Sequence, residues 1–470
     1  MPMPAEAAGG PGAGETLDLR TPRHIHIVGI GGAGMSAIAL VLRAMGHEVS
    51  GSDLKDSPVA SRLRSQGITV ALGHGAENVG AVHAVTYSPA VALHNPELVA
   101  AAAQGALVIP RSGMLAAICA TRRCLAVAGT HGKTTTASML ALILVEAGMR
   151  PSFLIGADVN EIGTNAAWDA GEWLVVEADE SYGTFRAIHP DLAVLTNVEA
   201  DHLDYYGTFG ELRAAFGAYV AAATDGAVVS SDDPQAAAIG SAGGAVSVGT
   251  AAGSTYTMTD VSPSRSAISF VLSGPAGELG VLRVGVPGRH NASNAALAAV
   301  AALRVGAPFA AAQSALARFA GVPRRFEFRG EAGGVTFIDD YAHLPTEVRA
   351  ALAAARSGGG GRVIAVFQPH RFSRTAALAD QFGTAFADAD ALVVTDVYGA
   401  GERPVPGVSG RLVVDAVRAQ DPRLAVVYAP GWEELPRVVA SLLVPGDLCL
   451  TLGAGDLTTL PDGLLESPQW

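Results

Sequence analysis

Two glycine-rich turns, each set between an apolar run and an alanine-rich segment, constrain the fold of this chain more than any other feature. The first is "HIHIVGIGGAGMS", residues 24–36, and the second is "LAVAGTHGKTTT", residues 125–136. Apolar runs that alternate with glycine turns and helical segments are typical of parallel sheets with helical crossovers. The pattern recurs along most of the chain after its first 20 residues. We therefore predict an α/β protein of about three domains.

Changes in composition suggest where the domains begin and end. Residues 1–20 are rich in Pro and Gly and lack the features of a signal peptide, so we expect a disordered tail. Short strands separated by Gly, Ser and Pro at 254–286 indicate an antiparallel portion added to the central domain. The expected domains are a Rossmann-like one at 21–120, a central P-loop ATPase α/β domain at 121–326 and a Rossmann-like C-terminal one at 327–470.

Charge and cysteine content exclude several classes of protein. The net charge is 31 − 44 = −13, which argues against non-specific nucleic-acid binding. The three cysteines, Cys119, Cys124 and Cys449, show no metal-binding spacing and predict small buried thiols in a reduced, cytoplasmic protein. No apolar run reaches roughly 18 residues, so we expect no membrane span. Whether the protein is a monomer or a homodimer stays open.

The second turn has the character of a phosphate-binding loop. Only two lysines occur in the chain, Lys55 and Lys133, and one of them lies in this turn. Gly129 and Gly132 would let backbone N–H groups surround phosphate oxygens, Lys133 would add a charge and Thr134 a hydroxyl for Mg²⁺. The strict motif has glycine at 127, where Val127 stands. The strand before and the helix after still favour a P-loop over a structural turn.

Acidic residues follow two apolar runs of the same central region. "WLVVEADES" supplies Glu177, Asp179 and Glu180, and "NVEADH" supplies Glu199, Asp201 and His202. A P-loop enzyme needs an acidic side chain at the end of a nearby strand to hold its metal. We expect at least one of these groups to meet Mg²⁺, although most acids after a strand are loop caps.

The first turn matches a dinucleotide fingerprint. Gly29, Gly31 and Gly34 have G-x-G-x-x-G spacing, and Asp53 ends the next apolar run. The motif would suit a nicotinamide or flavin enzyme. Physically, the motif binds a pyrophosphate at a helix N-terminus. A UDP-sugar also contains a pyrophosphate. The sequence leaves both ligands open at this point.

The C-terminal region holds "DDYAHLPTE" and "FQPHRFSRT". Arg371 and Arg374 follow an apolar run, where open α/β sheets bind ligands, and two arginines can clamp a carboxylate. Taken alone, this is more often a solvated loop, and a lone His343 is more often structural than catalytic.

Nine stretches in this order resemble the Mur ligases. They are "IHIVGIGGAGMSAIA", "VAGTHGKTTT", "EADES", "TNVEADHLD", "PGRHNASNA", "RRFEFRG", "DDYAHLPTEV", "FQPHRFSRT" and "GAGD", spanning residues 25–456. Within that family the first and eighth point to the ligase that joins L-alanine to UDP-N-acetylmuramate in peptidoglycan precursor synthesis. The resemblance implies ATP and Mg²⁺ as cofactors and the two small molecules as substrates.

The resemblance also implies roles for individual residues. ATP would be held by Gly129, Thr130, His131, Gly132, Lys133, Thr134, Thr135, His290, Asn291, Asn294 and Arg325. The UDP-sugar would meet Gly29, Gly31, Gly32, Gly34, Asp53, His74 and Ser88. The amino acid would meet Tyr341, His343, Arg371 and Arg374. Metal ligands would be Thr134, Glu177 and His202, and catalytic groups would be Lys133, Glu177, His202, His343 and Arg374.

Departures from the family pattern, at Pro89 among others, and several alternatives remain. Leu344 stands where the family usually has a second histidine, and Tyr182 where it usually has aspartate. The alternatives are a recycling ligase that adds a peptide to the same sugar nucleotide, a nucleotide-dependent oxidoreductase and a non-catalytic P-loop ATPase. The proton acceptor for the attacking amine is open between His202 and His343.

Overall fold

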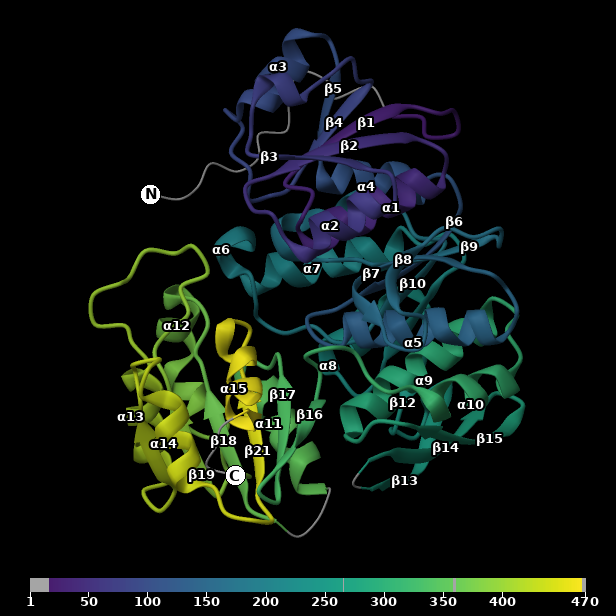
Figure 1. Cartoon of the computed structure of the whole chain (residues 1–470). Coiled ribbons are helices and arrows are strands. Elements are labelled where there is room, and N and C mark those ends of the chain that lie inside the picture. The colour runs from purple at the N-terminus through teal and green to yellow at the C-terminus, as the bar shows by residue number, and fades with distance from the viewer. Residues whose placement is uncertain (1–16, 265, 358–360, 467–470) are drawn as a thin grey trace. The chain divides into compact units, whose positions relative to one another are not determined.

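The chain forms three sheets flanked by helices, in a computed structural model that describes residues 17–264, 266–357 and 361–466 (Figure 1). They belong to two compact units. The first comprises the described chain up to residue 259 with 271–280 and 293–316, and the second comprises 260–270, 281–292 and the described chain from 317. The α/β class predicted from the sequence is confirmed. In the described residues, no helix combines the length and apolarity needed to cross a membrane.

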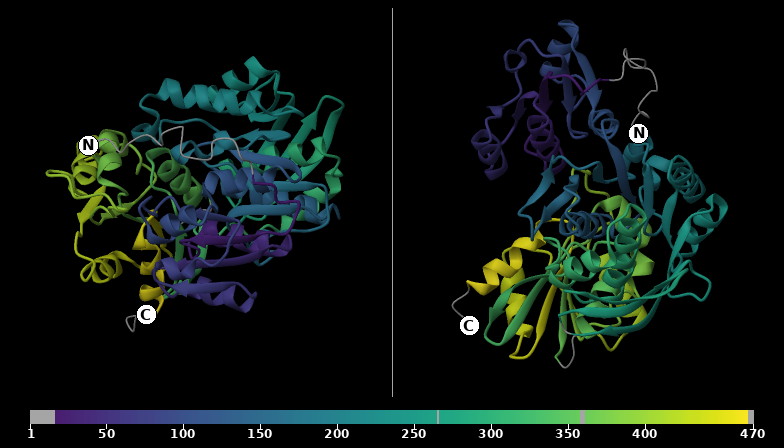
Figure 2. Two further views of the ribbon diagram at one scale, coloured as in Figure 1. Left: turned by 90° about the horizontal axis from the view of Figure 1, so that it is seen from above. Right: turned by 90° about the vertical axis from the view of Figure 1, so that its right-hand side faces the viewer.

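The first sheet is parallel and has the order β3-β2-β1-β4-β5. Its strands are β1 (His24–Val28), β2 (Glu48–Asp53), β3 (Thr69–Leu72), β4 (Ala84–Tyr87) and β5 (Leu107–Pro110). Residues of α1 (Ala33–Ala44), α2 (Pro58–Ser65) and α4 (Arg111–Cys119) pack on one face. On the other face α3 (Pro96–Ala103) packs through Leu98 and Ala101, as Figures 1 and 2 show in purple and blue.

The central sheet has ten strands in the order β15-β14-β13-β12-β11-β10-β6-β9-β7-β8. They are β6 (Arg123–Ala128), β7 (Ser152–Val159), β8 (Thr164–Ala167), β9 (Trp173–Glu177), β10 (Leu192–Leu195), β11 (Ala227–Ser230), β12 (Val246–Gly249), β13 (Tyr256–Pro263), β14 (Ile268–Gly274) and β15 (Gly277–Val284). The strand before the second glycine turn, β6, pairs in parallel with β9 and β10. This turn therefore lies at the carboxyl end of an interior strand.

The two ends of the central sheet differ from a simple parallel sheet. β7 and β8 form an antiparallel pair at one end, which the sequence analysis did not predict. At the other end the short strands expected near 254–286 are present, and β13 continues the main sheet by pairing in parallel with β12. The predicted β portion is thus an extension of the central sheet.

The third sheet has the order β16-β17-β21-β18-β19-β20. Its strands are β16 (Glu327–Ala332), β17 (Val335–Asp340), β18 (Val363–Phe367), β19 (Ala391–Val394), β20 (Ala425–Tyr428) and β21 (Leu448–Leu452). β16 is antiparallel to β17, whereas the other pairs are parallel. Along β18, Val363, Ala365 and Phe367 face one apolar cluster and Ile364 and Val366 face the other, so helices cover both faces.

The remaining helices connect these strands. They are α5 (Lys133–Glu146), α6 (Leu203–Tyr206), α7 (Phe209–Ala221), α8 (Pro234–Gly243), α9 (Arg289–Arg304), α10 (Phe309–Arg318), α11 (Pro345–Ser357), α12 (Phe372–Phe382), α13 (Arg411–Gln420), α14 (Leu435–Leu442) and α15 (Leu460–Leu465), with 3₁₀ turns η1 (Ala76–Asn78), η2 (Ser181–Ala187) and η3 (Asp456–Thr459). All three cysteines are free and buried, as predicted.

Candidate functional site

The carboxyl edge of the first sheet gathers the residues predicted for a nucleotide sugar. The glycine turn follows β1, Asp53 ends β2, and His74 and Ser88 follow β3 and β4. A Cβ built on Gly29 would lie 3.0 Å from Cβ of Ser88, and one built on Gly31 would lie 2.8 Å from Oδ2 of Asp53. Open α/β sheets bind ligands at this edge. The structure therefore brings the first loop, Asp53 and Ser88 into one place.

Asp53 supports the glycine turn through the backbone. Its Oδ2 accepts a hydrogen bond of 2.8 Å from the N–H of Gly31, and its Oδ1 accepts one of 3.2 Å from the N–H of Lys55. One oxygen is thus committed to holding the turn in shape. Direct contact between Asp53 and a sugar nucleotide stays a prediction.

Arg111 is a residue of this edge that the sequence analysis missed. It follows β5 directly and begins α4. A Cβ on Gly34 would lie 2.7 Å from its Nη2, so the guanidinium covers the start of α1. An anion at a helix N-terminus is stabilised by such a cation. The signal was present as an arginine directly after the apolar run "LVIP".

The second glycine turn is shaped by close backbone approach and by the next strand. Gly129 and Gly132 have φ of 137° and 78°, values that favour glycine. Oδ1 of Asn197, just beyond β10, accepts a hydrogen bond of 2.8 Å from the N–H of His131. A Cβ on Gly132 would lie 2.5 Å from Oδ1 of Asn294. The predicted ATP residues Gly132 and Asn294 therefore lie together.

Lys133 is held inside the turn by a buried carboxylate. Its Nζ donates to the carbonyl oxygens of Gly129 at 2.6 Å and Thr130 at 3.1 Å, and lies 2.8 Å from Oε2 of Glu180. Burial raises the pKa of Glu180 to about 7, against the opposing effect of the Lys133 charge. Burial also disfavours charge on Lys133, but Glu180 and its acidic neighbours outweigh this and raise the pKa of Lys133. The lysine is thus charged near neutral pH.

The hydroxyl of Thr134 and the carboxylate of Glu177 form an oxygen pair beside this turn. Oγ1 of Thr134 donates to Glu177 at 3.0 Å, and the N–H of Gly156 in β7 donates to Glu177 Oε2 at 2.9 Å. No group of three or more His, Cys, Asp or Glu side chains suited to a metal occurs in the described residues. Mg²⁺ is commonly held by one or two carboxylates plus phosphate oxygens, so this pair fits it.

His202 has a different set of contacts. Its Nε2 lies 3.1 Å from Oγ of Ser181, at the start of η2, and its backbone has φ of 52°. A non-glycine residue in this region is often found at functional sites. The predicted metal role of His202 stays a prediction.

The two glycine turns belong to the same compact unit and are connected by β7 and β8. Nδ2 of Asn165 in β8 lies 3.5 Å from the carbonyl oxygen of Ala33 in the first turn and 3.4 Å from that of Ile155 in β7. Ile155 precedes Gly156, which contacts Glu177. A short path of contacts therefore joins the first turn to the oxygen pair beside the second.

The other residues predicted for ATP have mixed surroundings. Asn291 is buried and its Nδ2 donates to the carbonyl oxygen of Pro287 at 2.7 Å, so its side chain braces the start of α9. Burial, assisted by the charge of Arg325, lowers the pKa of His290 to about 4, so this ring is neutral near pH 7. Arg325 lies over the Tyr341 ring, 4.9 Å from its centroid. Their contact with ATP stays a prediction.

The third group of predicted site residues forms an aromatic and basic cluster at the carboxyl ends of β17 and β18. The rings of Tyr341 and His343 have centroids 5.4 Å apart, and those of His343 and His370 are 5.5 Å apart. Nη1 of Arg374 lies 2.9 Å from Nδ1 of His370. Three of the four residues predicted to meet the amino acid are therefore close together. His370, which is not among the predicted site residues, contacts both His343 and Arg374, and Tyr398 stacks on it.

Arg371 and Leu344, which the sequence analysis placed near the amino acid, have surroundings of their own. Arg371 precedes α12 with φ of 65°, a strained value for arginine, and its N–H donates to the carbonyl oxygen of Tyr398 at 2.8 Å. Leu344 is 4% exposed and belongs to the core, so its side chain is removed from solvent. The side chain of Tyr182 lies outside the described part of the structure.

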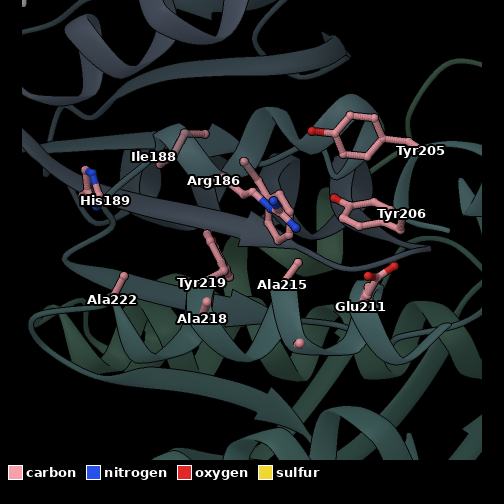
Figure 3. Close-up of a pocket in the computed structure, with 12 residues that line it drawn as sticks. Arg186, Ile188, His189, Tyr205, Tyr206, Glu211, Ala215, Ala218, Tyr219 and Ala222 are labelled. Carbon is pink, nitrogen blue, oxygen red and sulfur yellow. The ribbon is translucent and has the colours of Figure 1, made fainter. Parts of the chain in front are cut away.

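A separate pocket of about 750 Å³ lies among η2, α6 and α7 (Figure 3). Its polar lining includes Arg186, His189, Tyr205, Tyr206 and Glu211, and alanines of α7 line it as well. None of the residues predicted for ATP, sugar nucleotide or amino acid lines it. Tyr206 connects it to the P-loop region, because its hydroxyl donates to the carbonyl oxygen of Glu180 at 2.7 Å.

Comparison with protein families accounts for this arrangement. The Mur ligase family catalytic domain matches residues 24–123, the Mur ligase middle domain matches 127–302, and the Mur ligase glutamate ligase domain matches 324–455. The chain belongs to the Mur ligase family. The resemblance stated from the sequence motifs is confirmed.

Individual Mur ligases are similar over nearly the whole chain. The UDP-N-acetylmuramate–L-alanine ligase of Rubrobacter xylanophilus is 45% identical over 94% of this chain and 99% of its own length. The ligase of the same name from Kineococcus radiotolerans is 47% identical over 94% and 95%. The solved UDP-N-acetylmuramate–alanine ligase of Thermotoga maritima is 29% identical, with a TM-score of 0.80 over 94% of this chain and 98% of that one.

Proposed function

We propose that this Mur ligase uses ATP to join L-alanine to the carboxylate of UDP-N-acetylmuramate, a step in peptidoglycan precursor synthesis. The observation that carries the proposal is the pair of phosphate-type turns in one compact unit, connected by Asn165 and Gly156. One turn suits the pyrophosphate of a sugar nucleotide and the other suits a triphosphate. The relatives with this substrate name match along nearly their full length.

The reaction requires activation, because a carboxylate is a poor electrophile. In the proposed first step a carboxylate oxygen of the muramate attacks the γ-phosphorus of ATP, and ADP leaves. In the second, the neutral amine of alanine attacks the carbonyl carbon of the acyl phosphate, and phosphate leaves after a tetrahedral oxyanion. Separate domains would close before chemistry to exclude water from the acyl phosphate.

The residues of the second turn would stabilise charge in the first step. Lys133 exchanges its contacts with Gly129, Thr130 and Glu180 for phosphate oxygens. Thr134 and Glu177 would hold Mg²⁺, which when bound neutralises charge on the phosphates. Glu180, with a pKa of about 7, can take a proton once its lysine partner turns to phosphate.

The cluster of Tyr341, His343, His370 and Arg374 would receive the amino acid. Arg374 would pair with the alanine carboxylate. His343 is the favoured proton acceptor for the amine, since it lies in this cluster. Its Nδ1 already contacts the carbonyl oxygen of Tyr341 at 3.0 Å and Oε2 of Glu347 at 3.2 Å.

We further propose a cytoplasmic enzyme that works as a monomer or homodimer, with no nucleic-acid or membrane partner. The test of the reaction is phosphate release with ATP, Mg²⁺, UDP-N-acetylmuramate and a panel of amino acids and the tripeptide used in recycling. We expect release that requires all components, with L-alanine the best acceptor. Preference for the tripeptide would assign the recycling activity instead, and equal release without the sugar nucleotide would overturn ligation.

A further inference from the structure

A buried carboxylate lies behind the predicted sugar-nucleotide site and takes no part in the chemistry described above. Glu97 is the second residue of α3, and its side chain is 0% exposed. Placing an ionisable group in the core is costly unless several donors satisfy it. Burial acts to raise the pKa of Glu97, yet hydrogen bonds from His26, Ser52 and Asn78 hold it at about 2. The carboxylate is therefore ionised and can only accept.

One oxygen of Glu97 fixes the backbone around His74. Oε1 accepts hydrogen bonds from Nδ2 of Asn78 at 2.6 Å and from the N–H of Gly75 at 3.2 Å. The same Nδ2 donates to the carbonyl oxygen of Gly73 at 3.1 Å. Both neighbours of His74 are thus tied to this carboxylate, one directly and one through Asn78.

The other oxygen reaches the His74 ring through a serine. Oγ of Ser52 donates to Oε2 of Glu97 at 2.5 Å, and the same Oγ lies 2.9 Å from Nδ1 of His74. Nε2 of His26 lies 3.5 Å from Oε2 and is a weaker second contact. Ser52 is completely buried, whereas 14% of the His74 side chain is exposed. The chain of contacts therefore runs from the core to the ligand edge of the sheet.

The direction of each hydrogen bond in this chain follows from counting protons. A serine hydroxyl has one proton, and Ser52 gives it to the carboxylate. Ser52 must then accept from His74, so the proton of the imidazole lies on Nδ1. In the neutral ring, Nε2 is consequently an acceptor. Within the described part of the chain, no hydrogen bond is formed to that Nε2.

We propose that Glu97 is a positioning residue for the sugar nucleotide, which acts through Ser52 to keep the His74 proton on Nδ1. Nε2 then accepts a hydrogen bond from a donor of the nucleotide, such as the imide N–H of uracil or a ribose hydroxyl. The inference rests on the proposed function in placing the sugar nucleotide at His74. It adds a carboxylate, a serine and a defined ring tautomer to that site.

Glu97→Gln tests the direction of the hydrogen bonds that run from Glu97 through Ser52 to His74, while it preserves the volume of the side chain. The glutamine oxygen would replace Oε1, which accepts from Asn78 and Gly75, so its NH₂ would face Ser52. Ser52 would then accept from glutamine and donate to Nδ1 of His74, which moves the ring proton to Nε2. The N–H at Nε2 of His74 would then face the hydrogen-bond donor of the nucleotide, and no hydrogen bond could form between them. We expect the KM for UDP-N-acetylmuramate to rise about tenfold or more, with kcat and the KM for ATP unchanged.

Nitrogen-15 NMR of labelled imidazoles provides a second readout that needs no substrate. His74 is assigned by comparison with His74→Asn. We expect a protonated Nδ1 in the native protein and a protonated Nε2 in E97Q. If His74 carries its proton on Nδ1 in both proteins, or the KM for the sugar nucleotide is unchanged in a folded E97Q, the proposal is overturned.

Two further variants keep the test decisive. Ser52→Ala cuts the chain while leaving Glu97 bonded to Asn78 and Gly75, so it carries the test if E97Q does not fold. We expect S52A to show both ring tautomers and a smaller rise in KM, and a native NMR signature would contradict the proposal. Glu77→Gln, an exposed residue of the same loop, removes the same charge and should leave KM unchanged. Native protein without ligase activity would defeat the proposed function alone, since the NMR result does not depend on turnover.

Discussion

At the scale of single residues, the ion pair of Lys133 and Glu180 connects stability to phosphate binding. The ammonium of Lys133 is hydrogen-bonded to Gly129, Thr130 and Glu180, and it would exchange these contacts for phosphate oxygens when phosphate binds. Breaking a buried pair usually leaves an unpaired charge at a large cost. Here the cost is moderated, because a glutamate with a pKa of about 7 can become neutral by taking a proton.

Lys133→Ala should therefore abolish activity without unfolding the protein. We expect kcat to fall by about 10²–10³ or more, the size seen when a group that stabilises transition-state charge is removed. Phosphate release and the melting temperature are the measurements. Lys55→Ala is the matched control, since Lys55 is the other lysine and is exposed. Substantial turnover by K133A would contradict the phosphate role.

Glu97 predicts a specific dependence of stability on acid. Its pKa falls from 4.5 to about 2 on folding, so it stabilises the fold fully above pH 4.5 and loses that contribution as the pH falls toward 2. The difference corresponds to roughly 3 kcal/mol. E97Q should flatten the fall in melting temperature between pH 4.5 and pH 3. A slope equal to that of the native protein in this window would count against the assignment.

Arg374 predicts an effect on the acceptor substrate alone. With the guanidinium gone, the alanine carboxylate loses a charged partner, so Arg374→Ala should raise the KM for L-alanine about tenfold or more while the KM for ATP stays constant. Steady-state kinetics with each substrate varied measures this. Arg423→Ala, at a side chain that is 92% exposed, is the control. An unchanged KM for alanine would remove Arg374 from the pocket.

At the scale of elements, β7 brings backbone close to the predicted metal site. A Cβ on Gly156 would lie 2.6 Å from Oε2 of Glu177 and 3.5 Å from Oγ1 of Thr134. Only glycine therefore allows the strand to donate its N–H to that carboxylate without displacing it.

Gly156→Ala should move Glu177 and weaken Mg²⁺ binding. We expect the Mg²⁺ concentration for half-maximal activity to rise severalfold, with recovery of turnover at high Mg²⁺. Gly217→Ala in α7 is the control, since a Cβ there meets no atom within 4 Å. Equal Mg²⁺ requirements in G156A and the native protein would show that β7 does not set this site.

The elements also show what could be read from the sequence. Strands with continuous apolar runs, such as β6, β9, β18 and β21, were predicted because burial on both faces requires such runs. β3, β16 and β20 are partly exposed and carry no such continuous buried run, so their sequence does not predict a strand in this way. The domain boundaries near 121 and 327 stay predictions.

The same limit applies to the site. Local spacing in the sequence indicates the glycine turns, Lys133 and Glu177. Glu97, Asn165 and Arg111 act through partners that lie from 10 to 132 residues away in the sequence, or through close backbone approach. No local pattern encodes such contacts, so only the fold reveals them.

At the scale of the whole molecule, the residues predicted to bind ligands are divided between the two compact units. The glycine turns with His74, Ser88 and Glu177 belong to the first unit, and Tyr341, His343 and Arg374 belong to the second. Each unit has its own core. Sugar-nucleotide binding should therefore be separable from amino-acid binding.

Hydrogen–deuterium exchange can test this division. With UDP-N-acetylmuramate alone, we expect slower exchange in peptides covering 29–34, 52–54 and 73–78, and no change in those covering 341–347 and 370–375. Binding orders backbone amides locally, and exchange reports that ordering. Protection confined to the second unit would reverse our assignment of the first domain.

The scarcity of lysine gives the buried ion pair a practical consequence. An amine-reactive reagent meets only two ε-amino groups in this chain, one exposed at Lys55 and one enclosed by the phosphate turn. Because the ammonium of Lys133 is enclosed and paired with Glu180, Lys55 should react first, and the ratio of the two labels would report whether that ion pair is intact, without a chromophore and without an engineered tag. A covalent inhibitor aimed at that amine would have almost nothing else on this protein to modify.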